Sequence, residues 1–326
     1  MIDILFILLM IIISLFVLIK GADYLVDGAT DLARFLRVSP ILIGLTVVAF
    51  GTSLPEFIVS LFSVLGGSAD ISLGNIIGSN IANIALIIGF CAVITTQVVR
   101  SKTLIYEFPF LIVSSFLLII LGNDFYIHNQ NNFLLSRFDG LIFIILFVVF
   151  IYYIFQSMRG ERKSVKKEFK EEYESKKALW KSILLIVGGI LAIVVGGKLF
   201  INYASDLAIM AGLSEAFIGL TIAALGTSLP ELATSGVAAW KKQGDLAIGN
   251  IVGSNIFNIL FVLGVTSLIK PISINSSVLS VDGIIMIFVS LLFLVFATRK
   301  MSISRKEGIA LLTFYVIYIA FLIYRM

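Results

Sequence analysis

The chain has 326 residues, of which 59% are hydrophobic and only 13% are charged. A soluble domain carries about 25% charged residues, so the composition excludes a soluble protein or a disordered chain, and the single cysteine, Cys91, excludes a fold held by internal disulfides. The net charge of +4 comes mainly from short basic clusters between apolar runs, a pattern that indicates membrane orientation rather than nucleic-acid binding.

Ten apolar stretches are long enough to cross a bilayer, which takes about 20 residues. The sequence therefore predicts an all-α, polytopic membrane protein with ten transmembrane helices. The first stretch lacks a basic leading segment and a small-residue cleavage site, so a retained helix is favoured over a cleaved signal peptide. The predicted spans are roughly 3–33, 40–65, 73–95, 103–121, 138–157, 179–209, 215–240, 246–268, 277–297 and 305–324.

The only long hydrophilic stretch, Met158–Lys181, contains nine Lys or Arg residues and five Glu residues. Basic loops stay in the cytoplasm, so this stretch predicts a cytoplasmic linker, and counting five spans back places the N-terminus outside. With this orientation 19 of the 24 Lys and Arg residues fall in cytoplasmic loops. The predicted organisation is a five-helix repeat at 1–157, the linker at 158–181 and a second repeat at 182–326.

The two halves carry the same motif. Residues 51–83 (GTSLPEFIVSLFSVLGGSADISLGNIIGSNIAN) align without gaps on residues 226–258 (GTSLPELATSGVAAWKKQGDLAIGNIVGSNIFN) at an offset of 175, with 16 of 33 positions identical. Such a repeat indicates a duplicated structural unit. Five spans per half make the second copy enter the membrane from the opposite side, so inverted repeats are predicted. Inverted repeats place a substrate site near the membrane midplane, between the halves.

A glutamate lies in the middle of the same apolar span in each repeat. Glu56 lies within Ile41–Leu65, and Glu231 lies within Ala216–Trp240, with no Lys or Arg beside either. Burying a charge at that depth costs roughly 2.5–3.5 kcal/mol, so each acid is a functional candidate, and one divalent cation would neutralise both. The alternative is a pair of protonated acids that join helices by hydrogen bonds.

Oxygen-bearing residues accompany each glutamate at helical spacing. Thr52 precedes Glu56 by four residues, as Thr227 precedes Glu231, so that hydroxyl and carboxylate share a helix face. Ser53 and Ser228 lie three residues before the acids, close to the same faces.

A proline directly before each glutamate predicts a broken helix. Pro55 and Pro230 remove a backbone donor and clash with the carbonyl four residues earlier. We expect the carbonyls near Ala49 and Ala224 to be left open to an ion, a water or a neighbouring helix.

The predicted third and eighth spans add a second polar set. Ser79 and Asn83 are four residues apart, as are Ser254 and Asn258, so each hydroxyl shares a face with an amide. Glycines at four-residue spacing on the same spans favour close helix packing; they are Gly74, Gly78, Gly249 and Gly253.

The candidate site offers oxygen donors only. It has no thiolate or imidazole, because the only histidine, His128, falls in a polar loop far from the repeats in sequence. Oxygen donors suit hard cations such as Ca²⁺, Na⁺ or Mg²⁺ rather than zinc or copper, and flexible surroundings favour Ca²⁺ over Mg²⁺. Four further acids lie toward the ends of spans one and six, where an interface position or a paired charge is expected rather than a ligand: Asp23, Asp27, Asp31 and Asp206.

The motif pair GTSLPE…GNIIGSNIAN and GTSLPE…GNIVGSNIFN resembles the two alpha-repeats of the sodium/calcium exchangers, within the cation/calcium exchanger superfamily. The resemblance implies ten helices in two inverted halves and exchange of cytoplasmic Ca²⁺ for Na⁺, commonly three Na⁺ per Ca²⁺. It also implies a transporter rather than an enzyme, with no cofactor. We expect a plasma-membrane protein that functions as a monomer in lipid, with Ca²⁺ and Na⁺ as substrates and no nucleic-acid partner.

The resemblance also implies a role for each matching position. Glu56 and Glu231 become the carboxylates shared by Ca²⁺ and Na⁺, with Thr52 and Thr227 beside them. Asn83 and Asn258 close the centre of the site, and the long first and sixth spans form the sliding element. The implied lining of the Na⁺ sites is Ser53, Ser79, Ser228 and Ser254 with the carbonyls of Ala49 and Ala224.

The chain departs from the family pattern at one position. Prokaryotic and potassium-dependent relatives often carry Asp where this chain has Asn258. An amide cannot ionise, so Glu56 and Glu231 supply two formal negative charges, which still permits electrogenic 3:1 exchange. The departure bears on potassium dependence and on the affinity of the central site.

Three alternatives stay open. A Ca²⁺/H⁺ or Mg²⁺ exchanger is the closest, although the proton-coupled branch resembles GNxxE where this chain has GTSLPE. A cation channel is conceivable because an acidic midplane could also conduct. An intramembrane enzyme using Ser53 or Ser228 is disfavoured, because only Glu56 and Glu231 lie near enough in sequence to activate either hydroxyl.

Overall fold

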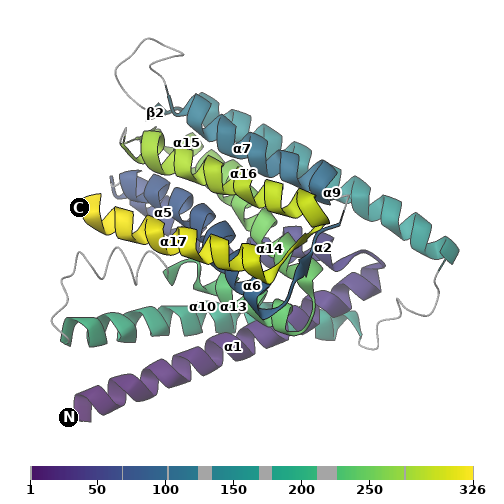
Figure 1. Cartoon of the computed structure of the whole chain (residues 1–326), viewed down its shortest axis with the longest axis horizontal. Helices are drawn as coiled ribbons and strands as arrows, with labels where there is room; N and C mark the ends of the chain where they lie inside the picture. The colour runs from purple at the N-terminus through teal and green to yellow at the C-terminus, as the bar shows by residue number, and fades with distance from the viewer. Residues whose placement is uncertain are drawn as a thin grey trace.

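The computed structural model describes residues 2–67, 69–100, 103–123, 134–168, 178–210, 226–274 and 277–325. These residues form α-helices, π-helical segments (η) and four two-residue strands (Figure 1). The first half contains α1 (Ile2–Leu36), α2 (Pro40–Ile43), η1 (Gly44–Val48), α3 (Ala49–Thr52), α4 (Leu54–Leu65), α5 (Ala69–Ala82), η2 (Asn83–Ile88), α6 (Gly89–Ile94), β1 (Gln97–Val98), η3 (Thr103–Glu107), α7 (Phe108–Leu121), β2 (Leu134–Leu135) and α9 (Arg137–Glu168). The second contains α10 (Leu179–Met210), α13 (Leu229–Trp240), α14 (Gly244–Ile256), η5 (Phe257–Leu263), α15 (Gly264–Ile269), β3 (Ile272–Ser273), η6 (Val278–Asp282), α16 (Gly283–Lys300), β4 (Ser302–Ile303) and α17 (Arg305–Arg325).

Helices long and apolar enough to cross a membrane dominate the described residues. Seven qualify singly, and an eighth candidate, Pro40–Thr52 with Leu54–Leu65, is a pair bent by 45°. Helix Ile105–Leu121 is apolar but shorter, and of the predicted span 215–240 only residues from 226 onward are described. The predicted membrane protein is confirmed, while the number ten stays a prediction.

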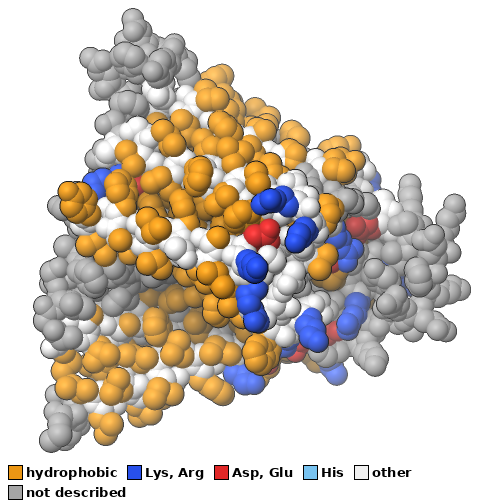
Figure 2. All heavy atoms as spheres, in the orientation of Figure 1, with side chains coloured by type: hydrophobic (Ala, Val, Ile, Leu, Met, Phe, Trp, Pro, Cys, Tyr) orange, Lys and Arg blue, Asp and Glu red, His pale blue; other side chains and the backbone are white. Residues whose placement is uncertain are grey.

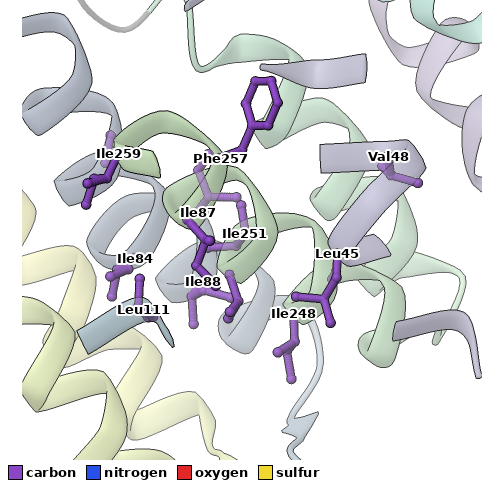
Figure 3. Close-up of a cluster of buried hydrophobic side chains, with 14 of the residues drawn as sticks. Leu45, Val48, Ile84, Ile87, Ile88, Leu111, Ile248, Ile251, Phe257 and Ile259 are labelled. Atoms are coloured by element: carbon purple, nitrogen blue, oxygen red, sulfur yellow. The ribbon is translucent and has the colours of Figure 1, made fainter. Parts of the chain in front are cut away.

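Two spans form the centre of the molecule. The most apolar stretch of Gly244–Ile269 is 94% buried and that of Ile71–Ile94 is 78% buried, against 22% for α1 and α17. Apolar side chains of these central spans and of η1 and α7 pack together in the core that Figure 3 shows. The outer helices turn their apolar side chains outward (Figure 2), as a lipid-facing surface requires.

Helices α1 and α10 form a tight antiparallel pair along one side of the molecule (Figure 1). Glycines allow the two backbones to touch: a Cβ on Gly189 would lie 2.7 Å from the backbone nitrogen of Leu25, and one on Gly196 would lie 2.7 Å from that of Leu18. The 35 residues of α1 span about 52 Å at 1.5 Å per residue, well beyond a hydrocarbon core of about 30 Å. The pair is therefore a long, closely packed unit.

The last helix of each half packs against the other half. Helix α17 lies on α6, where Gly308 faces Gly89, and α9 lies on α15, where Gly140 faces Gly264. Strand β1 pairs with β4 and β2 with β3, both antiparallel, so each strand pair also joins the two halves. The two halves of the sequence are thus interlocked in space.

Charged side chains gather at one end of the helices, where Figure 2 shows Lys and Arg clustered beside a largely apolar surface. Lys241, just beyond α13, pairs with Asp23 and Asp27 of α1, and Arg34 pairs with Asp31. Burial lowers the pKa of Lys241, but its hydrogen bonds to Asp23 and Asp27 outweigh burial and raise that pKa above its ordinary value. The predicted paired charges are confirmed for these three aspartates, whereas Asp206 is exposed on α10.

Two neighbouring glycines test the packing of α1 on α10. We expect Gly189→Ala to lower the free energy of unfolding by roughly 1–3 kcal/mol, because its Cβ would overlap the α1 backbone. Gly188→Ala is the matched control, since nothing lies within 4 Å of its Cβ, and alanine there stabilises the helix by up to about 1 kcal/mol. Thermal unfolding in one detergent measures both; equal melting temperatures would contradict the close approach.

Candidate functional site

A helix begins directly after the matching serine in both repeats. Helix α3 ends at Thr52 and α4 begins at Leu54, so that Ser53 lies between them with φ −85° and ψ 7°. Ser228 has φ −87° and ψ 2°, and α13 begins directly after it. The proline at the second position of each new helix needs no backbone donor there. The predicted break is confirmed in the first repeat; in the second, the residues before 226 lie outside the described part of the chain. In both repeats the glutamate lies in the first turn of the helix that begins after the serine.

The carbonyl beside the first break has a partner in the chain. The backbone N–H of Ser53 donates to the carbonyl oxygen of Ala49 at 3.0 Å, and the Thr52 hydroxyl lies 3.4 Å from the same oxygen. The expectation that this carbonyl turns only to an ion, a water or another helix is therefore wrong, because the break still closes one helical turn. A carbonyl oxygen has two lone pairs, so a further contact is possible. Ala224, its counterpart, lies outside the described residues.

The two glutamates are completely buried and close enough for their charges to interact. Oε1 of Glu231 accepts hydrogen bonds from the Ser53 hydroxyl at 2.9 Å and from the Ser254 hydroxyl at 3.3 Å. Both oxygens of Glu56 lack a hydrogen-bond partner, although the hydroxyls of Ser79 and Thr227 lie beside them. Within the described residues no basic side chain pairs with either acid. The site thus holds two acids, each able to carry a negative charge, and no basic partner among the described residues.

Hydroxyl contacts at the site run between the repeats. Besides the bond from Ser53 to Glu231, the Thr52 hydroxyl donates to Oδ1 of Asn250 at 3.1 Å. In the mirrored contact, the Thr227 hydroxyl donates to Oδ1 of Asn75 at 3.1 Å. Each half therefore takes part of its polar contacts from the other half.

The sequence reasoning missed Asn75 and Asn250. Both follow a glycine in the GNI part of the motif and are identical in the two repeats, which was the signal available. Nδ2 of Asn250 donates to Ser235 at 3.0 Å, whereas Nδ2 of Asn75 and the hydroxyl of the matching Ser60 lack partners.

Asn83 and Asn258 lie at π-helical distortions of the central spans. Asn83 begins η2 and Asn258 lies at the start of η5, and such distortions are frequent at functional sites. Nδ2 of Asn83 donates to Oδ1 of Asn255 at 2.8 Å, and Nδ2 of Asn258 donates to Oδ1 of Asn80 at 3.1 Å. Their own Oδ1 atoms are buried without a partner.

The site therefore concentrates unpaired oxygens. Buried polar atoms in native proteins almost always have a partner, so a cluster of oxygens without a protein partner indicates a site suited to a ligand. These oxygens suit a hard cation. Within the described residues they include both oxygens of Glu56, Oε2 of Glu231, Oδ1 of Asn83 and Asn258 and the hydroxyl of Ser228.

Comparison with known proteins identifies the family. The model of the sodium/calcium exchanger protein family matches residues 6–156 and 181–324. The chain belongs to the sodium/calcium exchanger family. This family transports ions, so the chain is an exchanger and not an enzyme, and the alternative of an intramembrane enzyme is wrong.

Relatives match over nearly the whole chain. The inner membrane protein YrbG of Escherichia coli is 35% identical over 96% of this chain and 95% of its own length. The sodium/calcium exchanger MaX1 of Methanosarcina acetivorans is 31% identical over 97% of this chain and 98% of its own length. A structure of the sodium-calcium exchanger NCX_Mj soaked without Na⁺ and Ca²⁺ matches with a TM-score of 0.81 and 31% identity, covering 98% of this chain and 99% of that one.

Removing one of the two buried charges tests the site without transport. We expect Glu56→Gln or Glu231→Gln to raise the melting temperature of the ion-free protein, because the repulsion between two buried carboxylates disappears. A gain of about 1 kcal/mol corresponds to roughly 2–4 °C. Asp206→Asn, at an exposed acid of α10, is the control and leaves the melting temperature unchanged. Lower melting temperatures for both Gln variants would contradict uncompensated charges.

Proposed function

We propose that this exchanger family member is a secondary-active antiporter that exchanges Ca²⁺ for Na⁺ by alternating access at the buried oxygen site. The observation that carries the proposal is the pair of fully buried carboxylates, one from each half, with no basic partner among the described residues. A bound cation would balance the negative charge of the two carboxylates, and the neutral oxygens around the pair would supply further ligands. MaX1 is named a sodium/calcium exchanger, and structures of NCX_Mj soaked with Na⁺, Ca²⁺ or Sr²⁺ support ion substrates of this kind.

The proposed ligands are those that the resemblance implies, and the contacts around the carboxylates support them. Glu56 and Glu231 bind Ca²⁺ and Na⁺ in turn, with Thr52 and Thr227 beside them. Asn83 and Asn258 close the centre with their unpaired amide oxygens. The further ligands of Na⁺ are Ser53, Ser79, Ser228 and Ser254 with the carbonyls of Ala49 and Ala224, the last outside the described residues.

We infer that the architecture is ten transmembrane helices in two inverted five-helix repeats, 1–157 and 182–326, joined by the linker 158–181. The matching helix breaks, the mirrored threonine contacts and the exchanged last helices support a pseudo-twofold relation. Alternating access follows if the pair of α1 and α10 slides along the central helices, and the long uninterrupted contact between the two supports motion as one unit.

The proposed location is the plasma membrane, with the N-terminus outside and a functional monomer. The charged end of the helices, where Lys241 meets α1, then faces the cytoplasm, in agreement with the basic loops. The name of YrbG, an inner membrane protein, supports the same membrane.

The charge of the site supports an exchange of three Na⁺ for one Ca²⁺. With two carboxylates and no further acid, Ca²⁺ leaves the site neutral and three Na⁺ leave it with one positive charge. Each cycle then moves one net charge across the membrane. Proton coupling is the alternative, because the same two carboxylates could carry protons.

The driving ion is tested by flux into inside-out vesicles or proteoliposomes. We expect Ca²⁺ uptake to require an opposing Na⁺ gradient and to be abolished in Glu56→Gln and Glu231→Gln. Asp206→Asn is the matched control and keeps wild-type flux. Uptake that follows a pH gradient without Na⁺ would establish the proton-coupled alternative, and flux without any counter-ion would establish a channel.

Stoichiometry is tested by the dependence of flux on membrane potential. With K⁺ and valinomycin setting the potential, Na⁺-driven Ca²⁺ uptake is expected to accelerate when the potential favours exit of the extra positive charge with Na⁺. Electroneutral exchange of two Na⁺ for one Ca²⁺ predicts no response. The ionophore alone, in liposomes without protein, is the control.

A further inference from the structure

We propose that Asn80 and Asn255 are positioning residues that fix which atom the amides of Asn83 and Asn258 present to the cation. The inference rests on the proposed function, because it assigns the orientation of two of the proposed ligands. Asn80 lies on α5, three residues before Asn83, and Asn255 lies on α14, three residues before Asn258; all four asparagines are completely buried.

The network starts from two backbone carbonyls. Nδ2 of Asn80 donates to the backbone oxygen of Asn255 at 3.3 Å, and Nδ2 of Asn255 donates to the backbone oxygen of Asn80 at 3.2 Å. A carbonyl oxygen accepts hydrogen bonds and cannot donate. Each of these side chains must therefore turn its nitrogen toward the other backbone, and neither amide can flip without losing that bond.

The orientation of Asn80 and Asn255 in turn fixes the orientation of the amides of Asn83 and Asn258. Because each nitrogen faces the other backbone, Asn80 and Asn255 turn Oδ1 toward the second pair of asparagines, and an oxygen of this kind requires a donor. Nδ2 of Asn258 donates to Oδ1 of Asn80, and Nδ2 of Asn83 donates to Oδ1 of Asn255. The oxygens of Asn83 and Asn258 are thereby left over, buried and without a partner.

This fixed orientation matters for binding a cation. An amide that flipped would present an NH₂ group to the ion, which repels a cation where the oxygen attracts it. Residues that orient metal ligands typically change metal affinity by 10- to 100-fold when they are removed. Each orienting contact runs between the repeats, because Asn255 of the second repeat orients Asn83 of the first, and Asn80 of the first orients Asn258 of the second.

Leucine substitutions remove one orienting contact at a time. Asn255→Leu deletes the acceptor for Asn83 but keeps the backbone carbonyl that holds Asn80, so Asn258 stays oriented. Asn80→Leu does the reverse. We expect each variant to lower Ca²⁺ affinity by about 10- to 100-fold, measured by calorimetric titration of the purified full chain with Ca²⁺ alone.

Aspartate substitutions separate positioning from a merely structural role. An aspartate presents an oxygen whichever way it turns, so Asn83→Asp removes the need for Asn255, and Asn258→Asp removes the need for Asn80. In the Asn83→Asp background, Asn255→Leu is expected to change Ca²⁺ affinity by less than about threefold, while the 10- to 100-fold loss persists in the Asn258→Asp background. Asn80→Leu shows the opposite pattern.

Each outcome decides the matter. A loss of the same size in both aspartate backgrounds, or unchanged affinity in both leucine variants, overturns the proposal and leaves Asn80 and Asn255 as contacts between helices. If the wild-type chain fails to bind Ca²⁺ while remaining folded, the proposed function fails first. Should Asn255→Leu not fold, Asn255→Ser, which is too short to reach Asn83, replaces it in the same two backgrounds.

Discussion

Two buried carboxylates that the protein leaves without a cation are the constraint on which the rest of the structure depends. An isolated charge in this setting is costly, and Glu56 and Glu231 lie close enough to repel each other. Polar contacts between the halves surround the two acids. Ser53 donates to Glu231, Thr52 donates to Asn250, and Thr227 donates to Asn75. A cation bound at the proposed site would supply the attraction that no basic side chain of the described residues provides, and it would thereby stabilise the contacts between the halves.

Local chemistry made much of the site predictable from the sequence. Proline removes a backbone donor directly before each glutamate, and helical spacing determines which hydroxyls share the face of that glutamate. The polar groups of residues 52–56 and 227–231 could therefore be predicted from these short segments alone. Identity between the repeats pointed to the same positions twice. These features depend on neighbours within a helical turn, which the sequence displays directly.

Partners distant in sequence could not be predicted in this way. Asn250 lies 198 residues from Thr52, and Asn80 lies 178 residues from Asn258; no spacing rule connects them before the helices are packed. The error at Ala49 has a local cause instead: Pro55 affects the carbonyl four residues earlier, that of Gly51, whereas the Ala49 carbonyl still accepts the N–H of Ser53. The packing of α9 and α17 against the opposite half could not be predicted from hydropathy either. An apolar sequence indicates that a helix lies in the membrane but does not indicate which helices it contacts.

The exchanged helices have a consequence for how the chain is made. Gly89 of α6 is covered by α17, and Gly308 of α17 has its packing partner more than two hundred residues upstream. When the first half has entered the bilayer, that flank of α6 therefore stays in contact with lipid until α17 is inserted. The first half is not fully packed before this helix of the second half lies against it.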